Sequence, residues 1–139
     1  MQRRDEEPVE VAIGYAAGPA GTGLAYAGLS DANGREVMRL PFRIARLSLF
    51  VERAVAYAAL VTVARALLRR GIRRARFVLP ETGFVEEVTT RRELPETLAL
   101  PYVRLRCALN ALDDYEIRSG ATDELMQRAR AEVALNLAA

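Results

Sequence analysis

The chain from residue 9 to residue 16 reads Val9-Glu10-Val11-Ala12-Ile13-Gly14-Tyr15-Ala16. Its larger apolar side chains alternate with small or charged ones, and a period of two is typical of a β-strand with one buried face. Residues 18–23, which follow, are rich in glycine and proline and mark a turn. This stretch therefore predicts a first strand whose chain turns back into a second strand over residues 24–29.

A tight turn is predicted between the second strand and a third. The sequence Asp31-Ala32-Asn33-Gly34 favours a hairpin, because Asn-Gly pairs tolerate positive φ angles. A third strand is expected over residues 35–44, with Val37, Leu40 or Phe42 facing the core. Pro41 has no N–H to donate to a neighbouring strand, so this strand should lie at a sheet edge or be bulged there.

The middle of the chain predicts a long helix followed by a buried strand. Apolar residues recur at helical spacing from Val51 to Leu68, Ser48 is expected to cap the amino-terminal end, and Gly71 is expected to end the helix. The run from Arg76 to Leu79 predicts a fourth strand. Since a helix connects it to the earlier strands, it should lie parallel to one of them.

The last third of the chain predicts three helices and one strand. A short helix is expected over residues 82–91, a loop over 92–97, helices over 98–113 and 123–138, and a strand over 115–118, with Thr122 capping the last helix. Residues 1–8 are expected to be a disordered arm and residues 9–139 a single domain. Cys107 lies in an apolar run and is predicted to be a small buried hydrophobic residue.

The composition excludes several kinds of site. The chain has 139 residues, 51% of them apolar, with one cysteine and no histidine, so zinc sites of thiolate and imidazole are excluded. A metal site would need carboxylates, which suits Mg or Mn. All twenty basic residues are arginine. We find neither a signal peptide nor an apolar run long enough to span a bilayer, and expect a cytoplasmic protein without a membrane partner.

The predicted order of elements resembles that of the ribonuclease H family. Residues 9–16 look like its first strand, which normally ends in Asp-Gly, and residues 18–24 resemble its Gly-Pro-rich connection. Residues 56–60 are similar to its central helix, where Ala-Glu precedes an aromatic or aliphatic residue. Thr122-Asp123-Glu124-Leu125 with Ala129 resembles its closing Ala-Asp-x-Leu-Ala motif. The resemblance implies an α/β fold with a five-stranded mixed sheet, ordered 3-2-1-4-5 and flanked by helices.

The resemblance also assigns four metal positions, where the family carries carboxylates that bind two divalent cations. In this chain they are occupied by Gly14, Ala56, Pro80 and Asp123. Because a two-cation site needs about three or four carboxylates, the resemblance implies a domain that has lost its catalytic residues and holds no cofactor. The alternative is a displaced Mg or Mn site formed by Glu52, Glu81 and Asp123, which would retain nuclease activity. The sequence thus leaves enzymatic activity open and favours its absence.

Nucleic acid is the partner that the resemblance implies, either an RNA/DNA hybrid or structured RNA bound through its phosphates. The candidate binding residues are the arginines that follow the long helix (Arg69, Arg70, Arg73, Arg74 and Arg76) and those that follow the short one (Arg91 and Arg92). The first group also fits a solvated helix C-terminus, where cations are favourable. The alternative function is a protein-interaction or self-association module, in which the Ala-rich helices and an edge strand bind a protein partner or a second copy.

Overall fold

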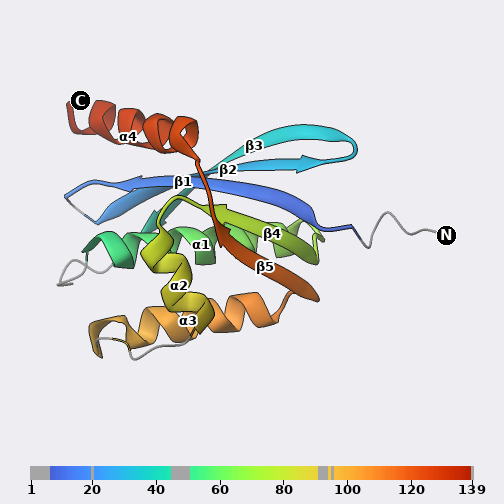
Figure 1. The fold of residues 1–139 in the computed structure, drawn as a ribbon. Coiled ribbons are helices and arrows are strands. Elements are labelled where there is room, and N and C mark those ends of the chain that lie inside the picture. The colour runs from blue at the N-terminus through green and yellow to red at the C-terminus, as the bar shows by residue number, and fades with distance from the viewer. Residues whose placement is uncertain (1–6, 20, 45–50, 91–93, 95, 139) are drawn as a thin grey trace.

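A five-stranded mixed sheet forms the centre of the molecule, seen in a computed structural model that describes residues 7–19, 21–44, 51–90, 94 and 96–138 (Figure 1). Its strands are β1 (Val9–Ala17), β2 (Thr22–Asp31), β3 (Gly34–Arg43), β4 (Arg74–Leu79) and β5 (Asp114–Ser119). They are ordered β3-β2-β1-β4-β5, with β1 to β3 antiparallel and β4 and β5 parallel to β1. The expected sheet is confirmed.

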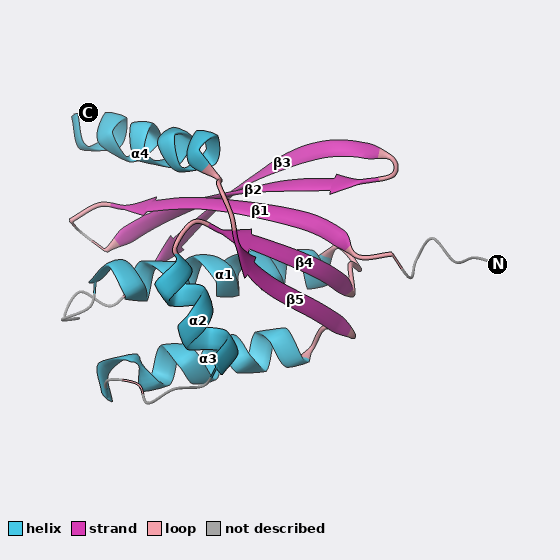
Figure 2. Cartoon of the chain, viewed as in Figure 1, coloured by secondary structure: helices cyan, strands magenta, loops and turns pink. Residues whose placement is uncertain are grey.

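Helices cover both faces of this sheet (Figure 2). They are α1 (Val51–Arg69), α2 (Thr82–Thr90), α3 (Ala99–Asn110) and α4 (Asp123–Ala138), with a 3₁₀ turn η2 at Glu96–Leu98. Figure 1 shows α1, α2 and α3 on one face and α4 on the other. Most of the expected amino-terminal arm, the expected cap at Ser48, and Arg91 and Arg92 lie outside the described residues.

The edge strand β3 explains how the sheet accommodates Pro41. The register between β2 and β3 is continuous from Thr22↔Arg43 to Asp31↔Gly34, so the strand is not bulged. Pro41 is tolerated because β3 is an edge strand and can leave one N–H position empty. Leu40 and Phe42 face the core as expected. The expectation for Val37 is wrong, because its odd position places it on the opposite face, where it is 47% exposed.

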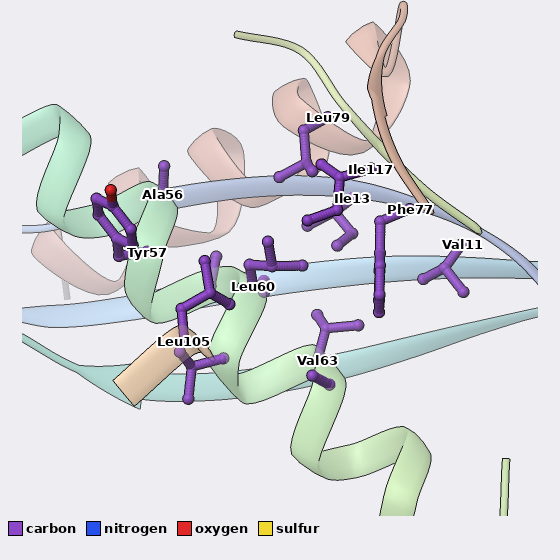
Figure 3. Close-up of a cluster of buried hydrophobic side chains, with 14 of the residues drawn as sticks. Val11, Ile13, Ala56, Tyr57, Leu60, Val63, Phe77, Leu79, Leu105 and Ile117 are labelled. Carbon is purple, nitrogen blue, oxygen red and sulfur yellow. The ribbon is translucent and has the colours of Figure 1, made fainter. Parts of the chain in front are cut away.

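The hydrophobic core lies between the sheet and α1, with α2 and α3 closing its far side. Alternate residues of the central strands point into it, and Figure 3 shows these beside the facing residues of the helices. Val11, Ile13, Phe77, Leu60 and Leu105 are all fully buried. Burial of such side chains contributes about 1.5–3 kcal/mol each, so this face supplies most of the packing that holds the fold.

Gly71 ends α1 as the sequence predicts. Its φ angle is 81°, a conformation that favours glycine. Its N–H donates to the carbonyl of Leu68 at 3.0 Å, and the N–H of Ile72 donates to the carbonyl of Leu67 at 2.9 Å. These bonds satisfy the last carbonyls of the helix and turn the chain into β4.

Cys107 is exposed, contrary to the prediction. Leu105, Ala108 and Leu109 form the buried side of α3. At about 100° per residue, Cys107 is rotated by roughly 200° from Leu105 and therefore points outward. The apolar run around Cys107 was a poor guide, because helical position decides which of its members are buried.

The amino-terminal end of α4 also differs from the prediction. The backbone carbonyl of Thr122 accepts the N–H of Met126 at 2.9 Å, which begins the helix. Its hydroxyl group is buried and has no hydrogen-bond partner among the described residues, so the side chain does not cap the helix. Over the same part of the chain, none of the helices combines the length and apolar character that a membrane span requires.

Candidate functional site

The carboxyl ends of β1 and β4 are where this topology places a ligand site. β1 has an antiparallel neighbour on one side and a parallel neighbour on the other, and ligands of α/β sheets bind at such switch points. The pairing of β1 with β4 ends at Ala12↔Val78. Beyond it, the N–H of Tyr15 donates to the sulfur of Met126 at 3.2 Å. A residue of α4 thus occupies the gap where the two strands separate.

Gly14, the first of the four implied metal positions, lies directly under α4. A Cβ atom at Gly14 would lie 2.4 Å from the carbonyl carbon of Leu125 and 2.4 Å from the amide nitrogen of Met126. Both are backbone atoms, so no side-chain rotation could relieve the overlap. With α4 in this place there is no room for any side chain at position 14, and therefore none for a metal-binding carboxylate.

The second and third positions offer no ligand either. Ala56 is fully buried on the sheet side of α1, inside the cluster drawn in Figure 3. A glutamate there would have to bury its charge in apolar surroundings, which is costly without a partner. Pro80 directly follows β4, and its ring carries no atom that could bind a cation.

The remaining acidic candidates do not form a cluster. Asp123 and Glu52 are exposed in the first turns of α4 and α1, respectively. Glu81 accepts a hydrogen bond from the hydroxyl group of Tyr15. In the ranges that the structure describes, no three acidic or cysteine side chains are placed to hold a metal ion together. The residues that the structure describes therefore do not fit a two-cation site.

Tyrosine–glutamate hydrogen bonds occupy the α1 side of this edge. Tyr57 donates to Glu87 at 2.5 Å, and Arg53 pairs with the other oxygen of Glu87 at 2.5 Å. Burial, followed by the hydrogen bond to Glu81, raises the pKa of Tyr15 far above its usual value. Burial and the bond to Glu87 raise the pKa of Tyr57 in the same way. Both phenols therefore stay protonated, and both carboxylates are engaged within the protein.

These contacts had no signal in the sequence. Tyr15 and Glu81 are 66 positions apart, and Tyr57 and Glu87 are 30 apart. The period-two pattern put Tyr15 on the buried face of the first strand with Val11, and nothing in the sequence indicated a polar partner for Tyr57. The acids reach these phenols from two places, Glu81 from the turn after β4 and Glu87 from α2.

The arginines after α1 are largely paired with acids. Arg70 binds Glu36 through two nitrogens at 2.6 and 2.9 Å, and its hydrogen bonds lower the pKa of that carboxyl group. Arg73 pairs with Asp113 and Arg76 with Glu116, each at 3.1 Å. Arg69 is exposed at the end of α1. The structure brings this cluster together but places an acid beside three of its arginines, which reduces its attraction for phosphate.

A second arginine group, not identified from the sequence, lies on the α4 face. Arg35, Arg39 and Arg43 occupy odd positions of β3 and so share that face. The guanidinium group of Arg128, on α4, lies 4.6 Å from the ring centre of Tyr26. The even spacing of Arg35, Arg39 and Arg43 within a predicted strand could have shown that they share one face. The position of Arg128 on α4 beside them could not be foreseen from the sequence.

By sequence, no family model matches the chain and no curated protein matches it. By structure, the chain is similar to RNase H1 of the halophilic archaeon Halobacterium salinarum, with a TM-score of 0.72, 20% identity, and coverage of 94% of this chain and 99% of that one. It is similar to an amino-terminal RNase H domain of Mycobacterium tuberculosis, with a TM-score of 0.65, 16% identity, and coverage of 93% and 99%. It is also similar to LC11-RNase H1 solved with an RNA/DNA hybrid, with a TM-score of 0.65, 11% identity, and coverage of 94% and 99%. The chain therefore has the ribonuclease H-like α/β fold that its sequence resembles.

Proposed function

We propose that this ribonuclease H-like domain binds RNA/DNA hybrids or structured RNA through their phosphate backbone and does not cleave them. The observation that carries the proposal is the packing of α4 on Gly14, where an added Cβ would lie 2.4 Å from backbone atoms. Cleavage by two cations requires carboxylates that converge on the metals. Of the four implied positions only Asp123 is acidic, so the chemistry lacks its ligands while the fold is kept.

Two observations support nucleic acid as the ligand. One structure with this fold, LC11-RNase H1, was solved with an RNA/DNA hybrid bound. In addition, every basic residue of the chain is arginine, whose planar guanidinium group matches the geometry of phosphate. Binding through the backbone would recognise the shape of an A-form duplex rather than its sequence.

The test is an anisotropy titration of a labelled RNA/DNA hybrid with Mn²⁺ present, at about 50 and about 200 mM salt. We expect binding that weakens about tenfold or more at the higher salt concentration, because each phosphate contact releases counterions. The probe should be intact when its length is checked on a denaturing gel afterwards.

Two results would contradict the proposal in different ways. Cleavage that Mn²⁺ supports and Asp123→Asn abolishes would show that a carboxylate site exists after all. A lack of binding at either salt concentration would remove nucleic acid as the ligand and direct the search to protein partners. Asp113→Asn is the matched control for the cleavage assay, since Asp113 is exposed and pairs with Arg73 away from α4.

A further inference from the structure

We infer that the nucleic-acid backbone binds along the edge strand β3, on the face of the sheet that α4 only partly covers. The contacts are made by Arg35, Arg39 and Arg43 of β3 and Arg128 of α4, which we call the β3–α4 arginine row. The inference rests on the proposed function and gives it a binding surface. That surface is distinct from the carboxyl ends of β1 and β4 and from the arginines that follow α1.

The register of the sheet aligns this row. Arg35 pairs with Ser30, Arg39 with Tyr26 and Arg43 with Thr22. Four residues of an antiparallel strand span about 14 Å, so the three arginines follow one face of β3 over about 27 Å. Figure 1 shows β3 at the edge of the sheet, with the β2–β3 hairpin extending beyond the end of α4. A long backbone could therefore follow the strand without crossing the helix.

Among the described residues, the ion pair seen within the row is that of Arg39 with Glu132. Glu132 of α4 accepts hydrogen bonds from Arg39, at 2.7 Å from its Nε atom, and from Tyr26. Glu36, the acid within β3, lies on the opposite face and binds Arg70. Glu132 is thus the acid hydrogen-bonded to the row, while Glu10, Asp123 and Glu124 line the cleft that Arg35 and Arg128 also line. The bond to Glu132 also holds Arg39 in place.

A cleft beside the row lets a backbone approach the sheet. It has a volume of about 710 Å³ and runs between the first turns of α4 and the strands. Ala12, Gly28 and Ser30 line its floor, and Val37 stands 47% exposed on its β3 side. Since the floor side chains are small, a sugar–phosphate ridge can sit low against the strands, with Val37 in contact with the sugars.

Acidic residues mark the other end of this cleft. Asp123 and Glu124 lie on the α4 wall. Glu10 lies on the β1 side and pairs with Arg118 at 2.7 Å. Phosphates would be repelled from the first turn of α4 and from Glu10, and attracted to the arginines of β3 and to Arg128 further along α4. This charge separation fixes the backbone over the strand rather than over the position that Gly14 occupies.

The surroundings of the row favour a duplex over a single strand. Single-strand binding relies on exposed aromatic rings that stack on bases. Tyr26, the aromatic residue at this place, is 5% exposed and lies under Arg128. The surface therefore offers cations and a shallow cleft, which suit the regular phosphate spacing of a duplex.

A pair of double variants tests the inference. Arg35→Glu/Arg43→Glu reverses two charges of the row, and Arg65→Glu/Arg104→Glu reverses two exposed charges of α1 and α3, on the opposite side of the sheet. The two proteins have the same net charge, so long-range attraction changes equally. We expect the first to weaken binding of the RNA/DNA hybrid at least about tenfold and to lower the slope of log K against log salt by about two. The second should weaken binding by less than about threefold.

Further measurements separate the possible failures. Circular dichroism melts should show that both double variants are folded, and the charge-neutral Arg35→Gln/Arg43→Gln should reproduce the loss in weaker form. Equal losses in the two double variants, or a larger loss in Arg65→Glu/Arg104→Glu, would overturn the β3–α4 arginine row while leaving nucleic-acid binding in place. Failure of the unaltered protein to bind the hybrid at low salt would overturn the proposed function and this inference together.

Discussion

The two faces of the sheet are built from different side chains. The face toward α1 carries large apolar residues such as Ile13 and Phe77, which are fully buried. The face toward α4 carries Leu24 and Tyr26 together with small residues, Ala12, Gly14 and Gly28, where α4 lies close to the strands. The first face holds the fold together. On the second, the backbone of α4 lies against Gly14, one of the four positions at which the resemblance implies a metal-binding carboxylate.

Removing a large side chain from the first face should have the largest effect. Phe77→Ala should lower the free energy of unfolding by about 3–5 kcal/mol, since it leaves a cavity in the core. Val78→Ala, one position along the same strand, is the matched control, because Val78 is half-buried and lines the open cleft on the α4 face. It should lose less than about 1 kcal/mol. Urea denaturation measures both, and equal losses would contradict the contrast between the faces.

The next largest effect is expected from adding one carbon atom to the face toward α4. Gly14→Ala should lower the free energy of unfolding by about 2–3 kcal/mol, because α4 must move away from the strand. Gly28→Ala is the control on the neighbouring strand, where the added Cβ would lie 3.5 Å from the side chain of Leu125, an ordinary contact. It should be close to neutral. A neutral Gly14→Ala would mean that α4 does not rest on position 14.

The hydrogen bond of Tyr57 should contribute less to the free energy of unfolding than either of these packing contacts. Tyr57→Phe keeps the ring, which packs edge-on against Phe84 with centroids 4.9 Å apart, but removes the bond to Glu87. Bonds to charged groups contribute about 1.5–3 kcal/mol, and we expect a loss of about 1–2 kcal/mol. Tyr115→Phe, which removes a bond accepted from Arg106 at 2.8 Å in a less buried place, should cost less than about 1 kcal/mol. A larger loss in Tyr115→Phe than in Tyr57→Phe would contradict the role given to Glu87.

The smallest effect expected is a change in the pH dependence of stability, caused by Glu132, which attaches α4 to the sheet. Hydrogen bonds from Arg39 and then Tyr26 lower the pKa of Glu132 in the folded protein. A lowered pKa means that this stabilisation is present above the unfolded value, about 4.3, and is lost as pH falls through the folded value. The free energy of unfolding should therefore fall below about pH 4, with a shallower fall in Glu132→Gln. An unchanged pH profile in that variant would show that Glu132 does not hold α4.

The sequence predicted the sheet well because its signals are local. The alternation from Val9, the Asn33-Gly34 turn and the glycine stop at Gly71 each depend on neighbouring residues, and all are confirmed. The errors at Val37 and Cys107 arose because the side on which a residue faces depends on register and helix rotation. Both are set by tertiary packing.

The candidate site was less predictable for a similar reason. The identities at the four implied metal positions could be read directly. That α4 rests on Gly14, and that Glu81 and Glu87 bind tyrosines, depends on contacts between distant segments. The arginine cluster after α1 was visible as a run, but its acidic partners Glu36, Asp113 and Glu116 come from three other strands or loops.

The main expectation is that the described residues of this chain form no site for two catalytic cations. Isothermal titration of the protein with MnCl₂ near pH 7 tests it most directly, with Asp123→Asn titrated in parallel. We predict no saturable heat up to about millimolar Mn²⁺ and identical traces for the two proteins, since one exposed carboxylate cannot hold the ions. Saturable binding of one or two ions that disappears in Asp123→Asn would contradict the account.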